Sequence, residues 1–175
     1  MAGVSVKTSG TIANILAPAE MLADNRGKQA MARALNHTLA KTETAVNRAT
    51  AKQSGLKYGD VKKEVRRFSA NAGKLEGEIK GQGGYHKLSA FKARKTKRGV
   101  SAAPWGERKV FASTFFIGKG VFKRVGAERF PVKTLYGPAV PKEMARREAK
   151  KAFEKTVGGA LPGRVLHEIA RLLKG

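Results

Sequence analysis

Basic side chains are the residues of this sequence whose density and spacing could do chemistry. The stretch from Lys87 to Arg98 has no acidic residue and contains six cations: Lys87, Lys92, Arg94, Lys95, Lys97 and Arg98. Cations at this density attract phosphates or acidic protein surfaces. Phe91 lies within the stretch and Tyr85 and His86 just before it, so nucleic-acid bases could stack on these rings. The alternative is a solvated loop whose charge only aids solubility.

A second basic group is expected on a short helix from Tyr58 to Ser69. Val61, Val65 and Phe68 would form its apolar side, and its opposite face carries the cations Lys62, Lys63, Arg66 and Arg67. This face could extend the basic surface of residues 87–98. The chain matches no sequence-reading module such as a zinc finger. Any contact with nucleic acid is therefore expected to be sequence-independent and salt-sensitive.

Groups that could catalyse a reaction do not converge in the sequence. The absence of cysteine excludes disulfides, thiolate metal sites and a cysteine nucleophile. His37 and His167 fall on different predicted helices, each without a partner at a metal-binding spacing. Glu76 and Glu78 would share one face of a strand and could bind a cation, but a solvated face is the simpler interpretation. We expect no enzymatic activity, no catalytic residue, no metal and no cofactor.

Two further features each allow two interpretations. The segment Gly81–His86 is rich in glycine, but the lysine and hydroxyl of a phosphate-binding loop do not follow it. A flexible hairpin or hinge loop is therefore favoured there. Trp105, the only tryptophan, lies between Pro104 and Gly106. It is either an interface anchor or a core residue beside a turn.

The elements that must position these groups are helices at both ends of the chain. Apolar residues at steps of three and four, such as Met31, Leu35 and Val46, predict a long helix from about residue 19 to 53. Ser54-Gly55 is a typical C-terminal stop. Pro141 is expected to start a helix over residues 142–157. Gly158-Gly159 should break that helix before a terminal helix that begins at Pro162.

Strands are expected between these helices. Glycines and alternating apolar residues from 71 to 136 predict an antiparallel sheet, with strands over 74–80, 88–93, 108–117 and 121–125. The fold class is thus α+β, with a long N-terminal helix and C-terminal helices packed on an antiparallel β-sheet. We expect one domain over residues 1–175. It divides into an N-terminal arm (1–18) with a short strand at Val4–Lys7, a helical part (19–69), the sheet (71–136) with a basic loop at 81–100, and the C-terminal helices (141–175).

Composition bounds the class of protein. The chain has 175 residues, 36 Lys+Arg against 13 Asp+Glu, a formal net charge of +23 and 41% hydrophobic residues. The hydrophobic content suffices for a core and argues against wholesale disorder. No apolar run is long enough to span a membrane, and Met1 to Gly10 lacks the pattern of a signal peptide. The charge is spread over every segment, so it does not form a dedicated tail, and its self-repulsion calls for an anionic partner.

The segment Pro131–Pro141 carries the most specific pattern. A strand over Val132–Tyr136 is expected to enter a turn at Gly137-Pro138, after which Pro141 launches a helix. This pattern resembles the minor tail protein Z family of lambda-like tailed phages. Ala34–Leu39 and Thr44–Arg48 look like the opening helix of that family. The resemblance covers roughly residues 28–155.

The resemblance implies a structural protein of the virion, made in the host cytoplasm, with no membrane partner. It would be a minor tail or tail-completion subunit at the head–tail junction, where a homo-oligomeric and expected hexameric ring caps the tail tube and helps join it to the head. Its partners would be tail tube, terminator and head-connector proteins, with non-specific contact to phage DNA. Tyr136, Gly137, Pro138 and Pro141 would fix the strand-to-helix corner. The alternative function is a sequence-independent nucleic-acid binder, associated with the nucleoid or the ribosome.

Overall fold

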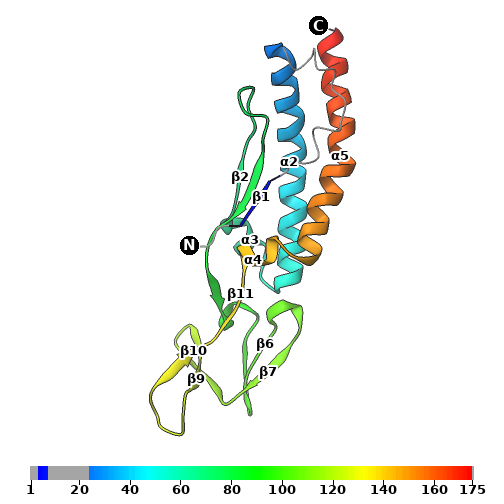
Figure 1. Cartoon of the computed structure of the whole chain (residues 1–175). Helices are drawn as coiled ribbons and strands as arrows, with labels where there is room; N and C mark the ends of the chain where they lie inside the picture. Colours follow the sequence, from blue (N-terminus) through cyan, green and yellow to red (C-terminus); the bar gives the residue numbers. More distant parts are fainter. Residues whose placement is uncertain (1–3, 8–23, 175) are drawn as a thin grey trace.

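Two long helices form the spine of the molecule. The computed structural model describes residues 4–7 and 24–174. Helix α2 (Asn25–Ser54) and helix α5 (Arg147–Lys174) lie side by side and run in opposite directions (Figure 1). The predicted apolar face of α2 is confirmed, since Met31, Leu35 and Val46 are all buried. Residues 19–23 of the predicted helix lie outside the described residues.

The C-terminal part is more continuous than the sequence predicts. A short helix, α4 (Val140–Met144), has Pro141 in its first turn as expected. The helix predicted over 142–157 is interrupted at residues 145–146, but α5 then runs unbroken through Gly158, Gly159 and Pro162. The predicted break and second start are therefore wrong. Val157, Leu161 and Val165 are buried against α2, and this packing outweighs the unfavourable helix propensity of glycine and proline.

The helix predicted over Tyr58–Ser69 is half wrong. Helix α3 covers only Tyr58–Glu64, and Val65–Phe68 forms strand β2. This strand pairs antiparallel with β3 (Glu78–Gly81), whose other edge pairs with β1 (Val4–Lys7), the strand expected in the N-terminal arm. Sheet pairing supplies the backbone of residues 65–68 with partners that lie far away in the sequence, which a local pattern does not reveal.

Beyond the spine, the chain forms small antiparallel sheets (Figure 1). Strand β4 (Tyr85–Lys87) pairs with β11 (Tyr136–Ala139). Besides this pair and the β1–β3–β2 sheet, strands β5 (Arg94–Thr96), β6 (Gly99–Ala102) and β7 (Lys109–Ala112) form a third sheet. Strands β8 (Thr114–Ile117), β9 (Gly120–Arg124) and β10 (Val132–Thr134) form a fourth, and β9 confirms the strand predicted over 121–125.

Four of the predicted strands differ. The strand predicted over 74–80 forms only from Glu78 onward, as β3, and the strand predicted over 132–136 is interrupted at Leu135, between β10 and β11. Residues 88–93 are not extended: Leu88–Ala90 form a 3-10 turn, η1, because Leu88 and Phe91 both turn into the core. The strand predicted over 108–117 is split by Ser113, whose φ of 58° lies in the left-handed region. The strand is interrupted there, and β7 and β8 join different sheets.

The core forms two clusters along α2. One lies between α2 and the sheets and includes Val46, Ile79 and Phe91, and the other lies between α2 and α5. The α+β class is thereby confirmed. A glycine ends α2, because Gly55 has φ 78° and a Cβ there would lie 2.4 Å from the carbonyl oxygen of Ala103. Within residues 4–7 and 24–174, no helix has the length and apolar character needed to cross a membrane.

Candidate binding surfaces

The basic stretch of residues 87–98 has regular secondary structure over much of its length. Lys87 ends β4, Lys92 follows η1, Arg94 and Lys95 lie on β5, and Lys97 and Arg98 form the turn into β6. The side chains of all six cations are exposed. The loop expected over 81–100 is therefore wrong, because short strands and a 3-10 turn occupy it.

The aromatic residues beside this stretch do not form a stacking platform. Phe91 is completely buried, so the expectation that bases stack on it is wrong. Tyr85 is exposed, but the ammonium group of Lys142 lies over its ring, 4.7 Å from the ring centroid, and also donates a hydrogen bond to its hydroxyl. What remains at the surface of residues 87–98 is charge.

The second basic group does not share one helix face. Lys62 and Lys63 lie on α3, whereas Arg66 and Arg67 lie on β2, where successive side chains point to opposite sides of the strand. Arg67 is further occupied by an ion pair of 3.4 Å with Glu43 of α2. The cations that lie on strands are spread over three sheets, with Arg66 and Arg67 on β2, Lys87 on β4, and Arg94 and Lys95 on β5.

The glycine-rich segment contacts a carboxylate. A Cβ at Gly83 would lie 2.6 Å from Oε2 of Glu64, and Nε2 of His86 lies 3.1 Å from Oε1 of the same residue. A negative group at this position opposes a phosphate. The segment joins β3 to β4, in keeping with a connection between strands.

The motif of residues 136–141 forms a tight corner. The turn predicted at Gly137-Pro138 is wrong, because both residues continue strand β11, with a bulge in its pairing that accommodates the proline. Gly137 is needed for packing: a Cβ there would lie 2.3 Å from Cε2 of Phe91. Pro141 is buried at the start of α4, and its Cα would lie 3.0 Å from a Cβ at Gly81. Tyr136 remains exposed.

Trp105 is not a core residue. Its side chain is 51% exposed, and its Nε1 donates a hydrogen bond of 3.1 Å to Oε1 of Glu143. It borders a hollow at the junction of α2 and α5. Of the two interpretations that the sequence left open, the exposed ring of Trp105 is compatible with an interface anchor.

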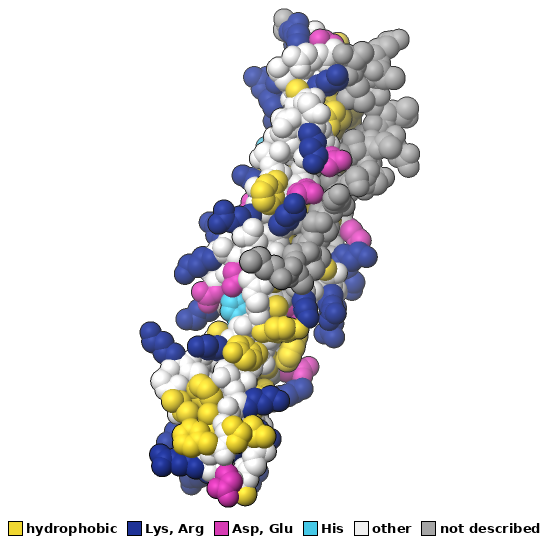
Figure 2. All heavy atoms as spheres, turned by 60° about the vertical axis from the view of Figure 1, so that its left-hand side comes forward, with side chains coloured by type: hydrophobic (Ala, Val, Ile, Leu, Met, Phe, Trp, Pro, Cys, Tyr) yellow, Lys and Arg dark blue, Asp and Glu magenta, His cyan; other side chains and the backbone are white. Residues whose placement is uncertain are grey.

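An apolar sheet face at the far end of the molecule escaped the sequence analysis. Phe115 lies opposite Phe122 in the register of β8 and β9, and Ile117 and Val132 are on the same side of this sheet. None of these four side chains is fully buried. We call them the distal apolar face; Figure 2 shows hydrophobic side chains gathered at this end. Ile117 is exposed and the other three are partly buried, with the guanidinium group of Arg124 over the ring of Phe115, 5.6 Å from its centroid. The alternation in β8 and β9 was visible in the sequence, but it did not reveal how far this side would be covered.

A second exposed apolar group lies on α5. Leu166 is 67% exposed and Leu173 is 73% exposed. They are seven residues apart, which places them on one side of the helix.

Figure 2 also shows Lys and Arg side chains along the length of the visible face, with fewer acidic ones between them.

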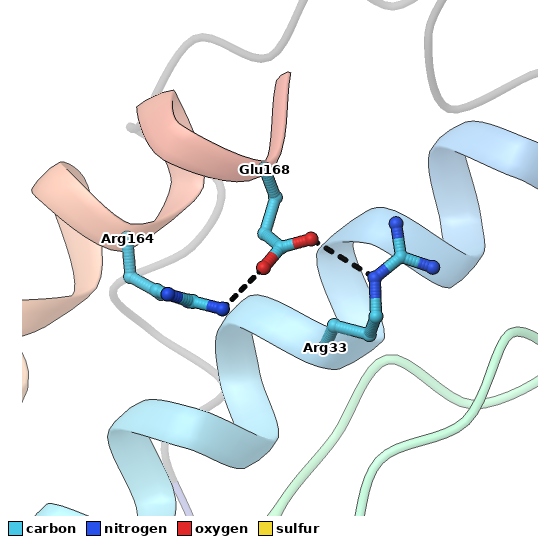
Figure 3. Close-up of polar contacts among 3 residues, drawn as sticks. All are labelled: Arg33, Arg164 and Glu168. Carbon is cyan, nitrogen blue, oxygen red and sulfur yellow. Dashed lines mark hydrogen bonds and ion pairs between the residues drawn. The ribbon is translucent and has the colours of Figure 1, made fainter. Parts of the chain in front are cut away.

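A buried carboxylate joins the two long helices. Glu168 of α5 is completely buried and accepts hydrogen bonds from Nε of Arg33 on α2 (2.9 Å) and from Nη2 of Arg164 (2.5 Å) (Figure 3). Burial raises the pKa of Glu168, but the hydrogen bond from Arg33 and the charges of Arg164 and Arg33 outweigh it and hold the pKa below its ordinary value. The sequence spacing of Arg164 and Glu168, four residues apart on one helix, could have indicated their ion pair, whereas nothing local indicated the pairing with Arg33.

The candidate metal ligands do not assemble. Glu76 and Glu78 each contact a lysine, at 3.4 Å from Lys74 and 2.7 Å from Lys80 respectively. Within residues 4–7 and 24–174, no group of three His, Asp or Glu side chains could hold a metal ion.

The fold and its surfaces define an elongated, basic α+β protein with exposed apolar surfaces at two separate places. The family model for prophage minor tail protein Z matches residues 20–174, and the chain belongs to this family. It is thus a structural protein of a phage tail and a component of the virion. No curated protein and no solved structure matches the chain.

Proposed function

We propose that this tail protein is a tail-completion subunit that forms a closed ring, expected to be a hexamer, at the head–tail junction. There it would cap the tail tube and help join it to the head, in contact with tube, terminator and connector proteins. The match to the minor tail family over residues 20–174 is the observation that carries the proposal. Such a family also points to a protein without enzymatic activity.

The positions of the exposed apolar groups support a ring. The distal apolar face and the Leu166–Leu173 surface lie on different elements, β8–β10 and α5. If one surface of a subunit binds the other surface of its neighbour, the contact is heterologous, and repeated heterologous contacts close into a ring when the rotation fits. With two such surfaces, each subunit could bind one neighbour on either side.

The ring is tested with one charged substitution in each surface, Leu166→Lys and Ile117→Lys. The wild-type chain should form a closed oligomer in native mass spectrometry and electron microscopy, alone or on isolated tails. Each variant alone should be monomeric. An equimolar mixture of the two should stop at dimers, because only one functional pair of surfaces remains. Gln82→Lys, at an exposed polar position, is the matched control and should assemble normally.

A strictly monomeric wild-type chain, both free and with tails, would contradict the ring. Absence of the protein from purified virions would contradict the junction role. Larger assemblies in the mixture of variants would show that the contact does not join these two surfaces.

The second candidate is sequence-independent binding of nucleic acid, favoured by the exposure of all ten cations singled out in the sequence. It predicts binding to duplex DNA that weakens steeply as salt rises. Filter binding at about 50 mM salt measures this. Undetectable binding there removes the candidate and leaves the tail function intact.

A further inference from the structure

A large hollow lies where the end of α2, the start of α5 and Trp105 meet. Its volume is about 1050 Å³. Ala49 of α2, Ala152 of α5 and Trp105 are among the residues that line it. A space of this size accommodates several side chains of a bound peptide.

The tryptophan of this lining is held by its polar edge. Glu143 is buried and accepts hydrogen bonds from Nε1 of Trp105 (3.1 Å) and from Nε2 of Gln53 (2.5 Å). The indole is therefore fixed in orientation while half of its surface stays exposed. Exposed, immobilised tryptophan rings are typical anchors for an apolar side chain of a partner.

The rest of the lining is strongly basic. Four cations surround it: Lys52, Arg147, Lys151 and Lys155. Glu148 is the one acidic residue of this lining, and Lys151 already neutralises it at 2.9 Å. The amide groups at the start of α5 are also occupied, since Oε1 of Gln53 accepts hydrogen bonds from the backbone of Glu148 and Ala149. The charge that remains for a ligand comes from side chains.

The backbone at the hollow is strained. Trp105 has φ 57° and Arg147 has φ 45°, two of the four non-glycine residues with positive φ among the described residues. Bulky side chains rarely adopt this conformation, which occurs at turns and at functional sites. Both residues line the same hollow.

We propose that this hollow binds an acidic segment of a protein partner. An aliphatic or aromatic side chain of the segment packs on Trp105 and the two alanines, and flanking carboxylates pair with Lys52, Arg147 and Lys155. A single confined aromatic suits a short peptide better than a nucleic-acid strand, which needs a groove that follows its backbone and successive rings. The inference goes beyond the ring, because it concerns one chain and a separate ligand.

The full-length chain is tested with the peptide acetyl-Glu-Glu-Leu-Phe-Glu-Glu-amide. Because Trp105 is the only tryptophan, its fluorescence reports directly on the hollow. We expect a saturable change in emission that weakens when salt is raised from about 50 to 500 mM. The same peptide with glutamine in place of glutamate should bind at least about tenfold more weakly, because its carboxylates are gone.

Variants locate the binding. Lys52→Gln with Lys155→Gln should weaken the peptide about threefold to tenfold, whereas Lys150→Gln with Lys174→Gln, which removes the same charge outside the hollow, should change little. Trp105→Ala, followed by the anisotropy of a fluorescein-labelled peptide, should lose most of the binding. Circular dichroism verifies that each variant is folded.

Three results would overturn the proposal. The first is no change in emission at millimolar peptide and low salt. The second is equal weakening by the two lysine pairs, which would indicate non-specific attraction to the net charge. The third is displacement of the peptide by an oligothymidylate that binds more tightly to the same hollow, which would identify a nucleic-acid site instead. None of these results depends on whether the chain forms a ring.

Discussion

At the scale of single residues, the corner between β11 and α4 depends on the absence of side chains. Gly137 faces the ring of Phe91, a residue at the centre of the core, and Gly81 faces Pro141. The glycine of the Tyr-Gly-Pro pattern in this chain therefore meets a packing requirement. The basic stretch surrounds the same ring, so Phe91 anchors the segment that presents the cations.

Gly137→Ala should destabilise the protein by about 1–3 kcal/mol, because the added methyl group overpacks a buried contact. Urea denaturation followed by circular dichroism measures the change. Gly126→Ala is the control, since a Cβ there meets no atom within 4 Å, and it should be close to neutral. Equal stability of the two variants would mean that Phe91 moves aside without cost.

At the scale of elements, a buried ion pair joins α2 to α5. Glu168 has no exposure of its own, whereas Arg33 and Arg164 are partly solvated. An uncompensated buried charge is costly, so the two helices are favoured in the alignment that keeps the three groups together. We infer that the cluster fixes the register of the pair.

Glu168→Gln should cost about 1–3 kcal/mol at neutral pH, a range reduced for the exposure of both arginines. The pKa of Glu168 in the folded state lies below its ordinary value of 4.5. The charged carboxylate therefore contributes its full stabilisation of the fold above pH 4.5, and this contribution is lost as the pH falls through the folded-state pKa. The difference between wild type and variant should shrink in this acidic range.

Denaturation at several pH values measures that difference. Glu154→Gln, which removes the exposed partner of Lys150 on the same helix, is the control and should change stability by about 0–0.5 kcal/mol. A difference for Glu168→Gln that stays constant down to acidic pH would contradict the assigned role of its charge.

At the scale of the whole molecule, the net charge of +23 acts over the length of the chain. The cations are distributed over the helices and the distal sheets, so no single contact relieves their repulsion (Figure 2). An acidic neighbour in the virion would do so more completely than a small ion. We therefore propose that the charge serves an interface with such a neighbour.

Raising NaCl from about 10 to 150 mM should raise the melting temperature of the free chain by about 2–4 °C, because screening reduces the repulsion. Differential scanning calorimetry measures the shift. A variant with Lys62, Lys95 and Lys97 replaced by glutamine should melt higher in low salt and respond less. A melting temperature that falls with salt would show that attractive pairs dominate.

Local patterns predicted much of this architecture. The stripe of Met31, Leu35 and Val46 places α2, and Gly55 ends it, because helix periodicity and a left-handed C-cap are encoded within a few residues. The predictions failed at Val65–Phe68, at Leu88–Phe91 and at Gly158–Pro162. In each case a partner distant in the sequence, a strand, the core or α2, overrides the local propensity.

The sequence by itself determined the class of protein: a basic α+β chain with helices at its ends and a Tyr-Gly-Pro segment at residues 136–138 that resembles a family of phage tail proteins. Only the tertiary structure decided which side chains act together. It buried Phe91, divided the second basic group between α3 and β2, joined Arg33 to Glu168 across 135 positions, and placed Trp105 beside the lysines of α2 and α5. The reason is that periodicity and charge are local, whereas burial and contact depend on how distant segments pack.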